Sequence, residues 1–155
     1  LLGFQLLSFG STKKRKAIKR SKFVFFDVGV TGALAKRGSI QEGSELMGKA
    51  FEHFIIQELR AYLWYEGYAD IPLQYWRSTT QYEVDLVVGK ELAIEIKCSE
   101  RISNKHLRGL HALSEESLIK RYMLVSRDPI QRKRGKIEII PWRNFLEQLW
   151  NGGFF

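Results

Sequence analysis

The sequence predicts an α/β protein in which helices flank a central mixed sheet, and two observations lead to this class. Residues 42–66 carry apolar side chains at three- and four-residue intervals, which is typical of an amphipathic helix. Several shorter segments are rich in Val, Ile and aromatic residues and are bounded by turn residues, which indicates strands. The 155 residues, 45% of them apolar and 27% charged, suffice for one globular domain with a sizeable core.

Each element follows from a local pattern. Gly67 ends the apolar repeat of the long helix, and Gly29 and Gly32 are expected to turn the chain after a short strand or extended segment that begins at residue 22. Helices are predicted at residues 42–66, 103–117 and 142–150. Further strands are predicted at residues 73–78, 82–88, 92–97, 121–126 and 136–140.

Residues 22–155 are expected to form the domain, and residues 1–21 a basic linker or the end of a preceding domain. The first residue is Leu rather than Met, and residues 1–22 offer little for a core, so we expect a fragment of a longer polypeptide. No apolar run reaches the roughly eighteen residues of a membrane span, and no secretory signal is visible. The single cysteine, Cys98, excludes a disulfide framework and a cysteine-based zinc site. A cytoplasmic protein without membrane contact fits best.

The net charge of +8 is concentrated near the N-terminus. KKRKAIKRSK, residues 13–22, has seven basic residues and no acidic one, and it opens with Lys13, Lys14, Arg15 and Lys16. A second basic cluster lies in a predicted loop and comprises Arg132, Lys133, Arg134 and Lys136. Such patches attract DNA or RNA through phosphate contacts. The alternative is a solvated linker that only aids solubility.

GSELMGKA, residues 43–50, matches a phosphate-binding P-loop at Gly43, Gly48 and Lys49, but Ala50 stands where the metal-binding hydroxyl should be. A P-loop follows a buried strand, whereas the preceding AKRGSIQE is polar. Gly48 falls inside the helical repeat, where close packing is its expected role. The sequence therefore predicts no nucleotide site here.

EVDLVVGKELAIEIK, residues 83–97, is predicted to form a β-hairpin with one apolar face. If that face packs on a single core, the cross-strand pairs are Val84–Ile96, Leu86–Ile94 and Val88–Leu92. The same register places Asp85 opposite Glu95 on the other face, with Lys97 one step along. A three-residue connection remains, which is a common hairpin length.

Two carboxylates this close predict a cation. Cross-strand β-carbons are about 4.5–5.5 Å apart, so Asp85 and Glu95 would repel each other unless something positive lay between them. Mg²⁺ or Mn²⁺ suits such oxygen ligands, and Lys97 could orient or deprotonate a water that attacks phosphate. Alternatively, the carboxylates line a solvent face and form surface ion pairs with Lys97 and Arg77.

Glu52, Asp85 and the Glu95-Ile96-Lys97 triplet, in that order, look like the PD-(D/E)xK nuclease superfamily, whose restriction-endonuclease-like fold has an αβββαβ core. Residues 22–150 further resemble the uncharacterised C-terminal domain of a large prokaryotic group of AAA-type ATPases. The stretches that carry this resemblance are KFVFFDVGVTGAL, GKAFEHFIIQEL, YWRSTTQYEVDLVV, AIEIKCS, LRGLHAL and IIPWRNFLEQLW.

The resemblance implies that Asp85 and Glu95 bind Mg²⁺ or Mn²⁺ and that Lys97 positions the attacking water. It implies that Glu52 assists as a further metal or water ligand, with Gly48 one turn earlier to let a strand approach. The alternative for Glu52 is a solvent-facing helix carboxylate. Val84 precedes Asp85 where the superfamily's name has Pro. The resemblance also implies an ATPase domain in the same full-length chain.

Other residues are candidates for nucleic-acid contact. Arg77 could hold a phosphate, and the preceding Tyr75 or Trp76 could stack on a base, although packing is the commoner role of aromatics. Lys105 and Arg108 share a face of the second helix, which could follow a nucleic-acid backbone.

Three functions remain as hypotheses. The leading one is a Mg²⁺- or Mn²⁺-dependent nuclease domain that serves an ATPase. The second is a catalytically inactive module that binds nucleic acid or a partner protein for that ATPase. The third is self-association through the many aromatic residues.

Overall fold

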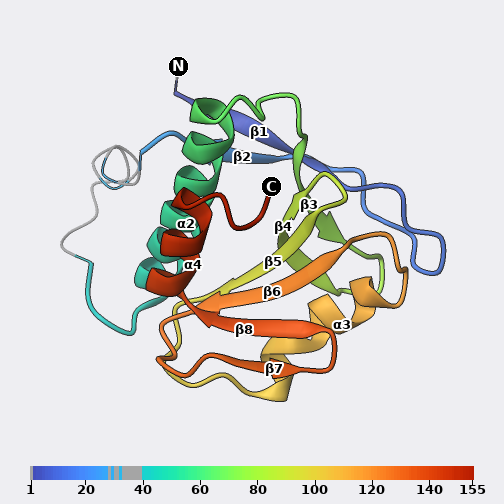
Figure 1. The fold of residues 1–155 in the computed structure, drawn as a ribbon. Coiled ribbons are helices and arrows are strands. Elements are labelled where there is room, and N and C mark those ends of the chain that lie inside the picture. The colour runs from blue at the N-terminus through green and yellow to red at the C-terminus, as the bar shows by residue number, and fades with distance from the viewer. Residues whose placement is uncertain (1, 28, 30–31, 33–39) are drawn as a thin grey trace.

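The computed structural model describes residues 2–27, 29, 32 and 40–155 and confirms a mixed α/β architecture (Figure 1). The strands are β1 Gly3–Ser8, β2 Lys22–Phe25, β3 Leu73–Arg77, β4 Glu83–Val88, β5 Leu92–Lys97, β6 Arg121–Ser126, β7 Arg132–Arg134 and β8 Ile137–Pro141. The helices are α2 Glu45–Tyr65, the 3₁₀ helix η1 Asn104–Leu107, α3 Arg108–Ser114 and α4 Trp142–Trp150.

All eight strands belong to one sheet, in the order β2-β1-β3-β4-β5-β6-β8-β7. The β3–β4–β5 pairings are antiparallel and the β5–β6–β8 pairings are parallel, so the sheet is mixed, as the sequence predicts. At the edges, β1 pairs parallel with β3, while β2 and β7 each pair antiparallel with their neighbour. The hairpin of β4 and β5 therefore lies in the middle of the sheet.

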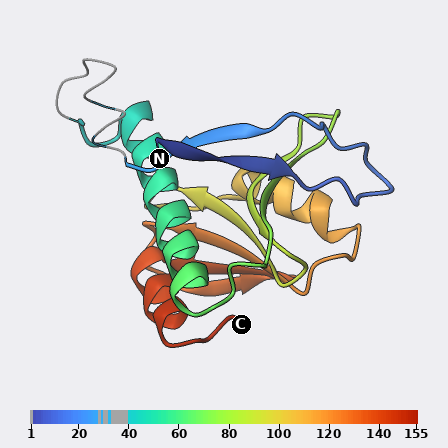
Figure 2. The same ribbon diagram turned by 90° about the horizontal axis from the view of Figure 1, so that it is seen from above.

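Helices cover both faces of the sheet, with α2 and α4 on one side and α3 on the other (Figure 2). The first face holds a core in which Ile55 and Leu59 of α2 pack with Leu86 and Ile94. The second face holds a separate core formed by η1, α3 and the opposite sides of the same strands, with Val87 among its members. The central hairpin is thus buried on both faces, which is usual for central strands.

The P-loop-like stretch forms the cap and first turn of α2. The Ser44 hydroxyl accepts a hydrogen bond from the Met47 N–H at 3.1 Å, and Gly43 precedes it with a φ of 76°. A β-carbon on Gly48 would meet no atom within 4 Å. The expectation that Gly48 permits close packing is therefore wrong.

Three further expectations are corrected. Leu6 of β1 and the nearby Phe9 are buried, so residues 1–22 do contribute to the core. Most of the second basic cluster is not in a loop, because residues 132–134 form the edge strand β7, whereas Lys136 lies in the turn that follows. The helix expected at 103–117 is shorter and begins with the 3₁₀ turn η1. None of the described helices is both long and apolar enough to cross a membrane.

Candidate functional site

The β4–β5 hairpin has the predicted register near its turn but not at its open end. Leu86 pairs with Ile94 and Val88 with Leu92, which leaves the predicted three-residue connection. Beyond Leu86 the ladder stops, and the Ile96 N–H donates instead to Asp85 Oδ2 at 2.8 Å. The predicted Val84–Ile96 pair is therefore not formed.

A β-bulge in β4 explains the change. Gln74 of β3 pairs with Val87 and Trp76 pairs with Val84, so a single β3 residue, Tyr75, faces both Asp85 and Leu86. The extra residue shifts the alternation of side chains between the two faces of the sheet. Val84 therefore packs in the α3 core with Trp76 rather than in the α2 core with Leu86. The sequence-based assignment of Val84 to the face of Leu86 is wrong, and the hairpin has no continuous acidic face.

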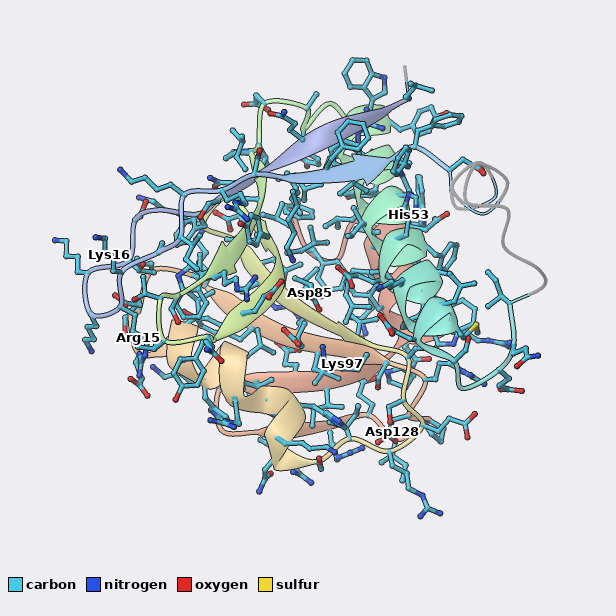
Figure 3. All side chains as sticks on the ribbon, turned by 180° about the vertical axis from the view of Figure 1, so that it is seen from behind. Arg15, Lys16, His53, Asp85, Lys97 and Asp128 are labelled. Atoms are coloured by element: carbon cyan, nitrogen blue, oxygen red, sulfur yellow. The ribbon has the colours of Figure 1, made fainter. Side chains whose placement is uncertain are left out.

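Asp85, Glu95 and Lys97 come together where the two strands part. Lys97 Nζ lies 2.5 Å from Glu95 Oε1 and 3.9 Å from Asp85 Oδ2. Figure 3 shows Asp85 and Lys97 side by side at the centre of the sheet. The two carboxylic residues are 8% and 7% exposed, and Glu95 Oε2 is buried without a hydrogen-bond partner among the described residues. The cluster thus places two carboxyl groups beside a single lysine, with little access to water.

Burial and neighbouring negative charge raise the pKa values of the carboxyl groups. Burial, and then the charge of Asp85, raise the pKa of Glu95 to about 8. Burial likewise raises the pKa of Asp85. Burial lowers the pKa of Lys97, but Asp85 and Glu95 more than offset this and hold it above its usual value. Lys97 therefore acts as a cation at neutral pH.

Glu52 and Lys22 complete the electrostatic environment. Burial and the charge of Asp85 raise the pKa of Glu52, a half-buried residue of α2, to about 7. Lys22, the first residue of β2, forms an ion pair with Glu83 and lies over the Tyr75 ring. Lys22 was not predicted as a site residue, because only the return of the chain through β1 and β2 brings it here.

Beside Lys97 opens a pocket of about 450 Å³ whose walls include Glu95, Lys105 and Arg108. The structure thus brings two of the predicted nucleic-acid contacts to the carboxylate cluster. Gly109 is needed for this approach, because a β-carbon there would lie 1.9 Å from the Glu83 carbonyl oxygen. The predicted Arg77 lies 3.8 Å from the Glu83 carboxylate, at the edge of the same region.

The first residues of the basic stretch are anchored to the end of α3. The Glu116 carboxylate accepts hydrogen bonds from the backbone N–H groups of Lys13, Lys14 and Arg15. The Arg15 guanidinium contacts Glu115 at 2.7 Å and lies 5.3 Å from the Tyr82 ring centre. Figure 3 shows Arg15 and Lys16 in this loop at one side of the molecule.

Tyr82 links the basic stretch to the pocket. Both Arg15 and Arg108 lie near its ring, with the Arg108 guanidinium 5.8 Å from the ring centre, and Tyr82 forms part of the pocket wall. Tyr75 and Trp76, by contrast, are 2% and 0% exposed, so stacking of these two rings on a base is excluded.

The site can be tested against the ligands that Mg²⁺ or Mn²⁺ requires. Both ions prefer carboxylate oxygens, and Glu95 Oε2 is a buried oxygen with no partner in the described part of the chain. Asp85 and Glu95 therefore fit as two ligands. Among residues 2–27, 29, 32 and 40–155, the structure holds no group of three His, Cys, Asp or Glu side chains that is placed to bind a metal ion. Glu52 feels the charge of Asp85 but is not a third member of such a group.

Comparison with known proteins identifies a family. A family model described as "Domain of unknown function (DUF4143)" matches residues 47–145, which is more than half of the chain and includes Glu52, Asp85, Glu95 and Lys97. No curated protein and no solved structure matches the chain.

Proposed function

The chain belongs to the family of the domain of unknown function DUF4143, and we propose that its central hairpin is the active site of a metal-dependent nuclease. The observation that carries the proposal is the hydrogen bond that the Ile96 N–H donates to the Asp85 carboxylate, beside Glu95 and Lys97. This hydrogen bond lies where β4 and β5 separate. There the buried acidic groups lie beside a pocket that is lined by basic residues. Strongly shifted carboxyl groups in a cleft are characteristic of functional sites.

Asp85 and Glu95 would hold Mg²⁺ or Mn²⁺ through their carboxylate oxygens. The bound ion would supply Lewis-acid stabilisation of the charge that develops on phosphate. Lys97 would hold the attacking water at Nζ, and Glu52, whose pKa of about 7 suits a general base, would accept the proton of that water. Lys105 and Arg108 would bind the phosphates that flank the scissile bond.

The order α2, β3, β4, β5, α3, β6 agrees with the αβββαβ core of restriction-endonuclease-like folds. We further propose that the domain descends from the restriction-endonuclease-like superfamily and serves an AAA-type ATPase in the same polypeptide. The substrate would be DNA or RNA.

The first experiment is a calorimetric titration of Mn²⁺ into the purified protein and into Asp85→Asn. Saturable binding that the substitution removes supports the site, and cleavage of labelled DNA and RNA then tests the activity. The matched control is Glu91→Gln in the hairpin turn, whose carboxylate pairs with Lys120 instead. Equal Mn²⁺ binding by wild type and Asp85→Asn would exclude the proposed metal site.

Two observations favour a second function, a catalytically inactive module that binds nucleic acid. Lys97 already contacts Glu95, and the described residues hold no preformed three-ligand metal group. This function predicts salt-dependent binding of nucleic acid that falls when Lys13, Lys14 and Lys16 are replaced by Gln and that does not change in Asp85→Asn. Filter binding at several salt concentrations separates the two functions.

A further inference from the structure

We propose that a second cavity, between the β7–β8 hairpin and the loop that follows α3, binds a phosphate group. The cavity has a volume of about 350 Å³ and surrounds the first residues of β6, Arg121 and Tyr122. Lys97 of the nuclease site pairs with Ser126, the last residue of β6. The two sites therefore lie at opposite ends of the strand, and the second does not depend on the first.

The wall of the cavity contains a buried hydroxyl that lacks a partner. Tyr122 is 3% exposed, and its phenolic oxygen makes no hydrogen bond to any described residue. Burial raises the pKa of this phenol and outweighs the Ile119 N–H, which acts on the oxygen in the opposite direction. An unsatisfied buried hydroxyl costs about 1–3 kcal/mol, so a ligand oxygen that accepts its proton would be favoured.

Positive charge surrounds this hydroxyl. Lys120, Lys133 and Lys136 line the cavity from three different segments and are exposed. Lys120 contacts Glu91 at 2.8 Å. Lys133 and Lys136 form no ion pair with any residue that the structure describes, so their charges are available to an anion.

The Glu138 carboxylate in the cavity wall would not repel a bound anion. Glu138 is held by Arg121 through two hydrogen bonds, of 3.2 and 3.1 Å, which neutralise its charge. The exposed Ser117 adds a hydroxyl group and has a φ of 54°, a strained value for a residue other than glycine. Hydroxyl and ammonium groups are the donors that phosphate oxygens accept from, and the residues that line this cavity supply both kinds.

Two sources could supply such a group: inorganic phosphate or a phosphate monoester, and the phosphodiester backbone of a nucleic acid. The test is an amide NMR titration of the full chain with inorganic phosphate, and separately with a short DNA oligonucleotide in EDTA so that no cleavage occurs. The variants are Lys133→Gln/Lys136→Gln and Tyr122→Phe. The matched control, Lys49→Gln/Arg143→Gln, removes two exposed charges from α2 and α4 on the other face of the sheet.

We expect saturable shifts at the amides of residues 117–122 and 133–136, and affinity about tenfold lower in the double Gln variant and lower in Tyr122→Phe. The control should bind as wild type does. A response to inorganic phosphate identifies the free or monoester source, and a response to the oligonucleotide alone identifies the nucleic-acid backbone. If neither probe shifts these amides, or if the control variant loses as much affinity as the double Gln variant, the proposal is wrong.

Discussion

Asp85 uses its carboxylate to bind the backbone N–H of Ile96, at a distance of 2.8 Å, in the position where the β-ladder would otherwise continue. A side chain therefore ends the pairing of the two central strands. The same bond holds the Asp85 carboxylate within the sheet, 3.9 Å from Lys97 and close to the buried Glu95. The geometry of the sheet and the electrostatics of the candidate site thus have one origin.

The hydrogen bond to Ile96 predicts different effects for two substitutions of Asp85. Asp85→Ala leaves the buried N–H without an acceptor and should lower the free energy of unfolding by about 1–3 kcal/mol. Asp85→Asn keeps an oxygen acceptor and removes a buried charge, so its free energy of unfolding should equal or exceed that of wild type. Urea unfolding of the three proteins without metal measures both effects. An equal loss in the two variants would show that the hydrogen bond is unimportant.

The raised pKa of Glu95 predicts that the metal-free protein loses stability as the pH rises. Glu95 binds its proton up to a pH of about 8 in the folded state, whereas it loses the proton near its usual pKa of 4.5 when unfolded. The folded protein therefore binds more protons between these values, and the free energy of unfolding falls across this interval. Thermal unfolding at several pH values should show the fall, and Glu95→Gln should reduce it. A stability that rises from pH 5 to pH 8 would contradict the assignment.

Asp128 predicts the opposite dependence at low pH. Its carboxylate accepts hydrogen bonds from Arg132 and from the N–H groups of Ile102 and Ile130, and the Arg132 contact contributes most to lowering its pKa to about 2. Its stabilising effect is complete above its usual pKa of 3.8 and disappears as the pH falls through about 2. Asp128→Asn should lower the free energy of unfolding at pH 7 by about 2 kcal/mol, which corresponds to the lowering of the Asp128 pKa from 3.8 to about 2. The control is Asp70→Asn, at an exposed position.

Two glycines in helices should respond to alanine in opposite ways. Gly109→Ala places a β-carbon against the Glu83 carbonyl oxygen and must displace α3, so it should destabilise the protein and disturb the pocket beside Lys97. Gly48→Ala meets open space within α2 and should stabilise the protein by about 1 kcal/mol. Chemical unfolding of both variants checks the pair, and stabilisation by Gly109→Ala would contradict the close contact.

Much of the fold could be predicted because its signals are local. The apolar repeat of α2 and the closing helix at 142–150 follow from side-chain spacing, and the pairing of Leu86 with Ile94 follows from alternation and turn length. Strand β1 was missed, although its apolar run LLGFQLLSF was a usable signal. The basic stretch that follows β1 is a stronger signal in the sequence, and it indicates charge rather than a strand.

The candidate site was predictable only in part. Asp85, Glu95 and Lys97 were expected together, and they do meet, but the bulge opposite Tyr75 was not foreseen because it depends on how β3 pairs with β4. The contact of Lys22 with Glu83 and the anchoring of the basic stretch by Glu116 join residues far apart in the chain. Nothing in the local pattern near Lys22 or Glu116 indicates these partners.

Periodicity and turn chemistry act over a few neighbouring residues, so the sequence alone predicted α2, α4 and the strands β3, β4, β5, β6 and β8, but not β1 or β7. Only the tertiary structure decided which faces were buried, where the β4–β5 ladder stopped and which charges met. Burial and Coulomb interactions depend on distances in space, and packing helices on both faces of the sheet left Asp85 and Glu95 largely removed from water. That removal raises their pKa values and makes the hairpin a candidate site.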